Sequence, residues 1–243
     1  RAIILSALIL CGISAVIMYS RAAQPLQKSS VITQAINDKN TPMVIKNLIL
    51  KMKEQMEVND DQFPELIKEV ENYTNSCADS ASVAVLHSML AEMYQNYFQR
   101  NQWTINQRTQ LSGYIPEDIR VWTSNLFTDK IKEEIDLSLR PTALLQNTPV
   151  SKFKDILEIG KDSQTLRPTL YEFLAFRALD IQPTVQIYKD LIAFQNKEPN
   201  MKSVLLTELD YLRFLYGDKR DKESFEAYMN ALDELYRNLA SQN

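Results

Sequence analysis

The most constraining feature of the sequence is the stretch from Ser80 to Arg100, which contains neither Gly nor Pro. Its apolar residues recur at three- and four-residue spacing, which places them on one face of a helix. These residues are Val83, Leu86, Leu90, Met93, Tyr94 and Tyr97. Asp79 or Ser80 can cap the first turn by accepting backbone N–H groups that lack partners within the helix. The stretch therefore predicts a central helix buried against other helices.

Further helices are predicted on both sides of this stretch. Apolar spacing, with Pro and charged residues at helix starts, predicts helices over 41–56, 63–75, 116–139, 169–179, 184–195, 202–216 and 222–240. Shorter helical pieces are expected near 142–145 and 152–159. Only 4 Gly occur in 243 residues, which argues against a turn-rich β architecture and against glycine-rich phosphate loops. The expected fold is all-α, an irregular antiparallel array of helix hairpins of the tetratricopeptide-like αα solenoid type, without a regular repeat period.

Three of these helices carry features that a structure can check directly. Thr41 is the expected N-cap of the 41–56 helix, with Pro42 in its first turn. The expected apolar side of the 116–139 helix is Ile119, Trp122, Leu126, Ile131, Ile135 and Leu139. The expected buried stripe of the final helix is Phe225, Tyr228, Leu232, Leu235, Tyr236 and Leu239.

The first 22 residues differ from the rest of the chain. Residues from Ala2 to Tyr19 are almost wholly apolar, and small residues at positions 20 and 22 would allow a peptidase to cut before Ala23. We predict a signal peptide or membrane anchor over 1–22 and a helical-repeat domain over 23–243, with a candidate sub-boundary at 181–183. Leu10 argues against a lipid anchor on Cys11, because a small residue should precede a lipidated cysteine. The rest of the chain is expected outside the cytoplasm, with membrane contact only through this segment.

Charge and motif content exclude several classes of function. A net charge of -4 and a pI near 5.2 give no general attraction to nucleic acid. The single histidine, His87, has no metal-ligand or catalytic partner near it in sequence, so we expect a structural role for it. Glu133, Glu134 and Asp136 stand among lysines and are expected on a solvated helix flank. Without hydrolase, nucleotide-binding or zinc motifs, we expect no enzyme activity, no cofactor and no metal site.

Three aromatic residues are candidates for an interaction surface. They are Trp103, Tyr114 and Trp122, and aromatic side chains often dominate the energy of protein contacts. The alternative for each of them is packing in the core. Trp103 is the strongest candidate, because it stands in the polar segment 101–116 that is expected to be a loop.

Two stretches of the sequence carry a family resemblance. One is LHSMLAEMYQNYFQRNQWTINQRTQLSGYIPEDIRVWTSNLFTDKI, from Leu86 to Ile131, and the other is LRPTLYEFLAFRALDI, from Leu166 to Ile181. Together they resemble the N-terminal region of the very large alpha-2-macroglobulin-like proteins of Bacteroidetes. The second stretch is the more specific, and weaker similarity covers most of the chain after the leader. One departure is that Ile181 passes directly to Gln182 and Pro183, where the family usually carries a longer insertion.

The resemblance implies a bacterial cell-envelope protein, periplasmic or membrane-attached, that inhibits endopeptidases by trapping them. In that family a bait segment is cut, the molecule rearranges, and a thioester within a C-x-E-Q motif captures the protease where the motif is present. Cys77 is followed by Ala78, Asp79 and Ser80, so no thioester residue transfers to this chain. The implied role is a non-catalytic helical scaffold or interaction domain. Its partners would be downstream domains or envelope proteins, and the full-length protein would act on target proteases.

A second hypothesis comes from a different functional class. A helical-repeat envelope protein could hold a glycan or a protein partner during nutrient uptake, with aromatic, Asn and Gln side chains lining the site. Such proteins are normally anchored by a lipid on a cysteine directly after the signal, and Leu10 argues against that arrangement here.

Overall fold

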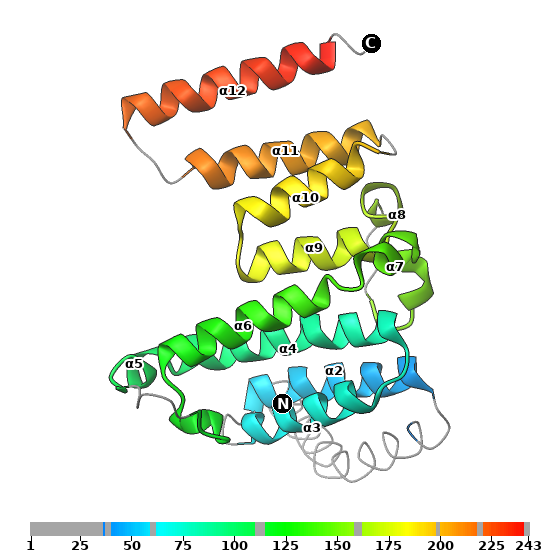
Figure 1. The fold of residues 1–243 in the computed structure, drawn as a ribbon, viewed down its shortest axis with the longest axis vertical. Helices are drawn as coiled ribbons and strands as arrows, with labels where there is room; N and C mark the ends of the chain where they lie inside the picture. The colour runs from blue at the N-terminus through cyan, green and yellow to red at the C-terminus, as the bar shows by residue number, and fades with distance from the viewer. Residues whose placement is uncertain are drawn as a thin grey trace, which may run out of the picture. The chain divides into compact units, whose positions relative to one another are not determined.

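The computed structural model describes residues 36, 40–58, 62–109, 115–157, 162–197, 200–217 and 221–240, with backbone only at 56–58, 163–164 and 239–240. The predicted leader over 1–22 and the candidate residue Tyr114 lie outside these ranges. The described chain is all-helical, as predicted (Figure 1), and its only extended pairing is an isolated bridge between Pro149 and Thr169. The chain divides into two compact units, residues 1–63 and 64–243.

The first unit contains helix α2 (Thr41–Val58). Its N-terminus is capped one residue earlier than predicted, because the side-chain oxygen of Asn40 accepts the backbone N–H of Met43 at 3.3 Å. The sequence predicts an apolar face of Ile45, Leu48, Ile49, Met52 and Met56. Of these, Ile45, Leu48 and Met52 are buried, Ile49 is half-buried, and the side chain of Met56 lies outside the described part; Val44 is buried as well.

The second unit contains the remaining elements. They are α3 (Phe63–Ser76), α4 (Ser80–Arg100), α5 (Gln102–Ile105), η1 (Ile119–Val121), α6 (Ser124–Ser138), α7 (Thr142–Asn147), η2 (Val150–Phe153), α8 (Ser163–Leu166), α9 (Leu170–Ile181), α10 (Val185–Gln195), α11 (Met201–Tyr216) and α12 (Lys222–Ala240). The η elements are short 3-10 helices. Most helix boundaries lie within two residues of the sequence-based ones, because Pro and capping residues determine them locally.

Helix α4 is the central helix of this unit, and it packs against both α6 and α9. Asp79 caps it by accepting the backbone N–H of Ser82 at 3.1 Å. Of the predicted stripe, Val83 is half-buried and the other five members are buried. Small residues on the other sides of the helix, among them Ala81, Ala84 and Ala91, are buried as well. The helix is therefore enclosed around most of its circumference.

The prediction of one helix over 116–139 is wrong at its start. The 3-10 turn η1 comes first, and α6 begins only at Ser124. The side chain of Asp118 accepts the backbone N–H of Arg120 at 2.9 Å, which caps η1, and Trp122 and Thr123 are extended. The buried residues of α6 are Phe127, Ile131, Glu134, Ile135 and Ser138, whereas Leu126 and Leu139 are half-buried.

An aromatic cluster joins α4 to the segment that precedes α6. Phe127 has its ring centroid between 5.3 and 6.5 Å from those of Tyr94, Tyr97, Phe98 and Trp122. The rings of Trp122 and Tyr94 stack at 5.7 Å with an interplanar angle of 6°. The indole N–H of Trp122 donates to the carbonyl of Pro116 at 2.7 Å, which satisfies the one polar atom of its ring. Trp122 is thus a core residue of this unit.

From α9 onward, each helix packs on the next one in the chain (Figure 1). Thr169, Thr184 and Asn200 cap α9, α10 and α11 through their side chains. The candidate sub-boundary at 181–183 covers the last residue of α9 and part of the turn that leads to α10, and these two helices are in contact.

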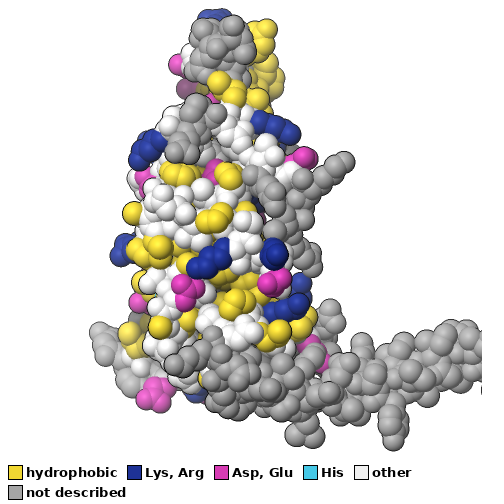
Figure 2. Space-filling view, turned by 90° about the vertical axis from the view of Figure 1, so that its right-hand side faces the viewer, with side chains coloured by type: hydrophobic (Ala, Val, Ile, Leu, Met, Phe, Trp, Pro, Cys, Tyr) yellow, Lys and Arg dark blue, Asp and Glu magenta, His cyan; other side chains and the backbone are white. Residues whose placement is uncertain are grey.

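The predicted burial of the α12 stripe is wrong. Phe225 is 61% exposed and Tyr236 is 72% exposed, while Tyr228, Leu232 and Leu235 are only half-buried. The reason is that α12 packs chiefly on a single neighbour, α11, which covers only one side of it. Figure 2 accordingly shows exposed hydrophobic side chains at the height of α12, at the top of the view.

Candidate functional site

The three aromatic residues proposed as an interaction surface are not brought together by the structure. Trp103 lies on the one-turn helix α5, in place of the expected loop, and is 78% exposed. Trp122 is 9% exposed and belongs to the aromatic cluster, so it is not a surface residue. Tyr114 lies outside the described residues. Of the two candidates that the structure describes, Trp103 has the exposure that an interface residue needs.

His87 has a hydrogen-bond partner that could not be predicted from the sequence. Its Nδ1 lies 2.7 Å from Oε2 of Glu134, a residue 47 positions away on α6. Lys130 contacts the other oxygen of Glu134 at 2.8 Å. The side chain of Glu134 is only 2% exposed, so its expected place on a solvated flank is wrong, whereas Glu133 and Asp136 are exposed as predicted.

The group extends to α3 through a second carboxylate. The hydroxyl of Tyr94 donates to Oε1 of Glu71 at 2.7 Å, and Lys130 lies 4.0 Å from the same oxygen. We call Glu71, His87, Tyr94, Lys130 and Glu134 the α3–α4–α6 polar network. It joins side chains from α3, α4 and α6. Hydrogen bonds require specific atoms to meet, so the network fixes the positions of these helices along one another more closely than apolar packing alone does.

The pKa shifts in this network show which ionisation states the fold stabilises. Burial disfavours the ionised form of Glu134, but hydrogen bonds from His87 and Lys130 outweigh it and hold its pKa below the usual value. Burial also opposes the charge on Lys130, yet hydrogen bonds to Glu134 and Glu133 raise its pKa. Burial, followed by the hydrogen bond to Glu71, raises the pKa of Tyr94, which keeps the phenol protonated.

The His87–Glu134 pair orients an imidazole, as a general base requires, but a nucleophile must also be within reach of the imidazole. Among the described residues, no hydroxyl or thiol is hydrogen-bonded to His87, and no group of three or more metal-ligating side chains occurs. The arrangement within the described part of the chain is therefore that of a hydrogen-bonded pair, with Glu134 buried, which connects α4 to α6.

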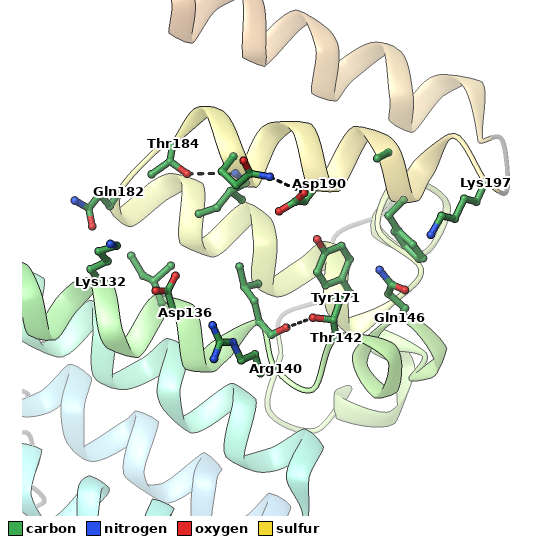
Figure 3. A pocket seen from close by; sticks show the side chains of 16 residues that line it. Lys132, Asp136, Arg140, Thr142, Gln146, Tyr171, Gln182, Thr184, Asp190 and Lys197 are labelled. Atoms are coloured by element: carbon green, nitrogen blue, oxygen red, sulfur yellow. Dashed lines mark hydrogen bonds between the residues drawn. The ribbon is translucent and has the colours of Figure 1, made fainter.

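A cleft elsewhere in the same unit has the properties of a binding site. Its volume is about 670 Å³, within the usual range for ligand pockets, and it lies among α6, α7, α9, α10 and the turn before α10 (Figure 3). We call it the α6–α10 cleft. Its apolar lining comes from Ile135, Leu139, Ile187, Ala193 and Phe194. Its polar lining comes from Lys132, Asp136, Arg140, Thr142, Gln146, Tyr171, Gln182, Thr184, Gln186, Asp190 and Lys197.

Tyr171 is the most informative residue in this cleft. It is only 4% exposed, yet no described residue forms a hydrogen bond with its hydroxyl. Figure 3 shows the side chain in the middle of the cleft, between the α6 and α10 side chains. Burial, with a smaller contribution from Asp190, raises the pKa of Tyr171 to about 12. The phenol therefore stays protonated, and its hydroxyl can donate a hydrogen bond to a ligand in the cleft.

Charged side chains lie along the length of the cleft. Lys132 and Lys197 lie at opposite ends in Figure 3, with Arg140 between them on the α6 side. None of these three cations forms an ion pair with a described residue. Asp136 and Asp190 also line the cleft, and Asp190 accepts a hydrogen bond from Gln186 at 2.9 Å. The cleft therefore offers both apolar surface and unpaired charge to a ligand.

The sequence contains each of these residues but no pattern that joins them. Lys132 and Asp136 share one side of α6 because they are spaced four residues apart, and Arg140 follows just after the helix ends. Tyr171 and Asp190 come from two later helices, and only the fold places them opposite that row. The only indication of the cleft in the sequence was a row of alternating charges on a predicted helix, and such rows more often lie on a solvated face.

Comparisons with protein-family models, curated proteins and solved structures gave no match for this chain. The family resemblance of its two stretches therefore stays a prediction. Among the helices that the structure describes, none combines the length and apolar character needed to span a bilayer. On the face drawn in Figure 2, the described basic and acidic side chains are interspersed with hydrophobic ones.

Proposed function

We propose that this chain is a non-catalytic helical scaffold that holds a segment of another protein or domain. In line with the family resemblance, we place it in the N-terminal region of a bacterial alpha-2-macroglobulin-like cell-envelope protease inhibitor. Inhibition by trapping would then be carried by downstream domains. The helices would form an irregular tetratricopeptide-like array that positions these parts relative to one another.

The α6–α10 cleft is the observation that carries this proposal. It combines an apolar lining with unpaired charges and with the unpartnered hydroxyl of Tyr171. These groups can bind a ligand and orient it, but they include no paired nucleophile and base among the described residues. The exposed Trp103 offers a second contact point on the surface of the same unit.

The alternative role, holding a glycan during nutrient uptake, is less well supported by this cleft. Sugar sites commonly present the face of an aromatic ring, whereas the Tyr171 ring is buried and meets the Phe194 ring edge-on at 5.2 Å. The amides of Gln146 and Gln182 could bind hydroxyl groups, but they serve peptide groups equally well. We therefore favour a polypeptide ligand.

The proposal can be tested with the complete reading frame. We expect it to continue well beyond Asn243 into β-rich domains, and we expect the full-length protein to protect a protein substrate from endopeptidases. Deletion of residues 64–243 should weaken that protection while leaving the downstream domains folded by circular dichroism. A reading frame that ends near Asn243, or a full-length protein that slows no endopeptidase, would contradict the inhibitor assignment.

A further inference from the structure

We propose that the α6–α10 cleft binds an extended acidic peptide segment, with an apolar side chain at its centre and carboxylates on either side. This inference rests on the proposed function, because it names the chemistry of the segment that the scaffold would hold. Three features of the cleft carry it: the unpartnered phenol, the apolar floor and the distribution of cations.

The hydroxyl of Tyr171 selects for a neutral acceptor. Asp190 lines the cleft together with Tyr171, and its negative charge would repel an anion placed beside the phenol. A peptide carbonyl accepts a hydrogen bond without bringing charge. Asp190 can in turn accept a peptide N–H, which would place both polar groups of one backbone segment at the centre of the cleft.

The centre of the cleft is also apolar. Ile135 and Leu139 come from α6, and Ile187 and Phe194 come from α10, so both walls contribute hydrocarbon surface. An apolar side chain next to the bound peptide group would remove this surface from water, which gives about 25 cal/mol per Å² of buried apolar area. A fully hydrophilic ligand would gain nothing from this apolar surface.

The cations determine the sign of the charge on the ligand. Lys132, Arg140 and Lys197 have no ionic partner among the described residues, and they are spread from one end of the cleft to the other (Figure 3). The lining also holds two carboxylates, Asp136 and Asp190, of which Asp190 accepts from Gln186, so the three cations exceed the anions by one charge. Acidic side chains at both ends of the segment would pair with Lys132 and Lys197, and the planar guanidinium of Arg140 fits a carboxylate with two parallel hydrogen bonds.

The experiment is a selection of random peptides displayed on phage against the immobilised full chain, followed by fluorescence anisotropy on the enriched peptides. We expect the enriched peptides to carry Asp or Glu on both sides of an apolar residue. The Tyr171→Phe variant should bind them about fivefold more weakly, because it loses one hydrogen bond and little packing. The double variant Lys132→Glu, Lys197→Glu should bind them at least about tenfold more weakly.

Lys189→Glu provides the matched control. This lysine is exposed on the same helix as the cleft residue Asp190 but does not line the cleft, so binding should be unchanged. The cleft lysines have no partner within the described chain, so their replacement should not impair folding, and thermal melts will verify this. A glucuronic-acid disaccharide is added as a competitor, and we expect no displacement of the peptide.

Several results would overturn the inference. Enriched peptides that are basic, or that bind both cleft variants as tightly as the wild type, would move the peptide site away from this cleft while leaving the scaffold proposal in place. Displacement by the disaccharide would identify a sugar site instead. If no peptide is enriched, the inference fails; if the chain also fails to bind its own downstream domains, the proposed function fails with it.

Discussion

The region around α4 and the region around α12 show how differently two amphipathic helices can be used. α12 has the more sharply amphipathic sequence, yet none of its described side chains is fully buried. α4 is less amphipathic, and its buried residues include Ser82, Ser88 and several alanines. The difference arises because α4 has neighbours on several sides, whereas α12 packs chiefly on α11. Periodicity therefore identifies a helix, but the number of its neighbours determines how much of it is buried.

Charged side chains also differ in burial between the α4 region and α12. Next to α4, the buried carboxylate of Glu134 is stabilised by a contact with His87 and by an ion pair with Lys130. On α12, the ion pairs Lys222–Glu226 and Arg237–Asp233 are exposed pairs within one helix, which contribute little to stability. The stability of the second unit should therefore be concentrated around α4 and α6.

The largest expected effect is that of Phe127→Ala. This side chain is fully buried and contacts four other aromatic rings, so its loss leaves a cavity in the core of the unit. We expect the free energy of unfolding to fall by about 3–5 kcal/mol, measured by urea denaturation followed by circular dichroism. Phe127→Leu, which keeps most of the volume, should lose much less. If replacing a large apolar side chain of α12 by Ala lowered the free energy of unfolding as much as Phe127→Ala does, stability would not be concentrated around α4 and α6.

The next effect is that of Glu134→Gln, which removes the charge but keeps the shape. Lys130 and His87 would then lie in a partly buried site without their anion, and we expect a loss of about 2 kcal/mol. This is below the value for a fully buried pair because Lys130 and His87 both keep some contact with water. Glu133→Gln is the control, since Glu133 contacts the same Lys130 from a position that is 58% exposed. Equal losses for the two variants would show that burial does not matter here.

The same carboxylate makes stability depend on pH. The pKa of Glu134 is lower in the folded protein than its usual value of 4.5, so its contribution is present above that pH and is lost as the pH falls through the lower, folded value. We expect the free energy of unfolding to decrease more steeply with acid for the wild type than for Glu134→Gln. Urea denaturation at a series of pH values from about 6 to 3 measures this difference. Parallel pH profiles would contradict it.

The smallest effect is expected for Phe225→Ser on α12. Because this ring is 61% exposed, the free energy of unfolding should change by no more than about 0.5 kcal/mol. Hydrogen exchange provides an independent measurement, since amides of α12 should exchange faster than those of α4. A loss of several kcal/mol, or equal protection of the two helices, would show that α12 is covered in solution.

The sequence was sufficient for the parts of the fold that depend on nearby residues. Asp79, Thr169 and Thr184 begin helices where their short polar side chains can accept backbone N–H groups. The apolar spacing of α4 identified the large side chains of its buried stripe but not the small buried residues on its other sides. The start of α6 was misplaced, because the hydrogen bond from Trp122 to Pro116 competes with a continuous helix over that segment.

What depends on distant residues could not be read from the sequence. Glu134 stands among lysines and resembles a solvated side chain until His87 is placed beside it. The cleft is even harder to predict, since Arg140 follows α6, Tyr171 lies on α9 and Lys197 follows α10. Neither feature has a motif, because the spacing of its residues along the chain reflects the path of the helices and not the chemistry of the site.

Glu172 connects two helices through one buried side chain. Its Oε2 accepts from Thr169 at the start of α9, at 3.1 Å from the backbone N–H and 2.8 Å from the hydroxyl, while its Oε1 accepts from Gln195 at the last residue of α10. Thr169 also belongs to the bridge with Pro149, which is flanked by backbone hydrogen bonds from Val150 to Pro168 and from Leu170 to Thr148. A displacement of α10 by a bound segment would thus be transmitted through a single carboxylate to the loop between α7 and η2, on the side of the cleft opposite α10.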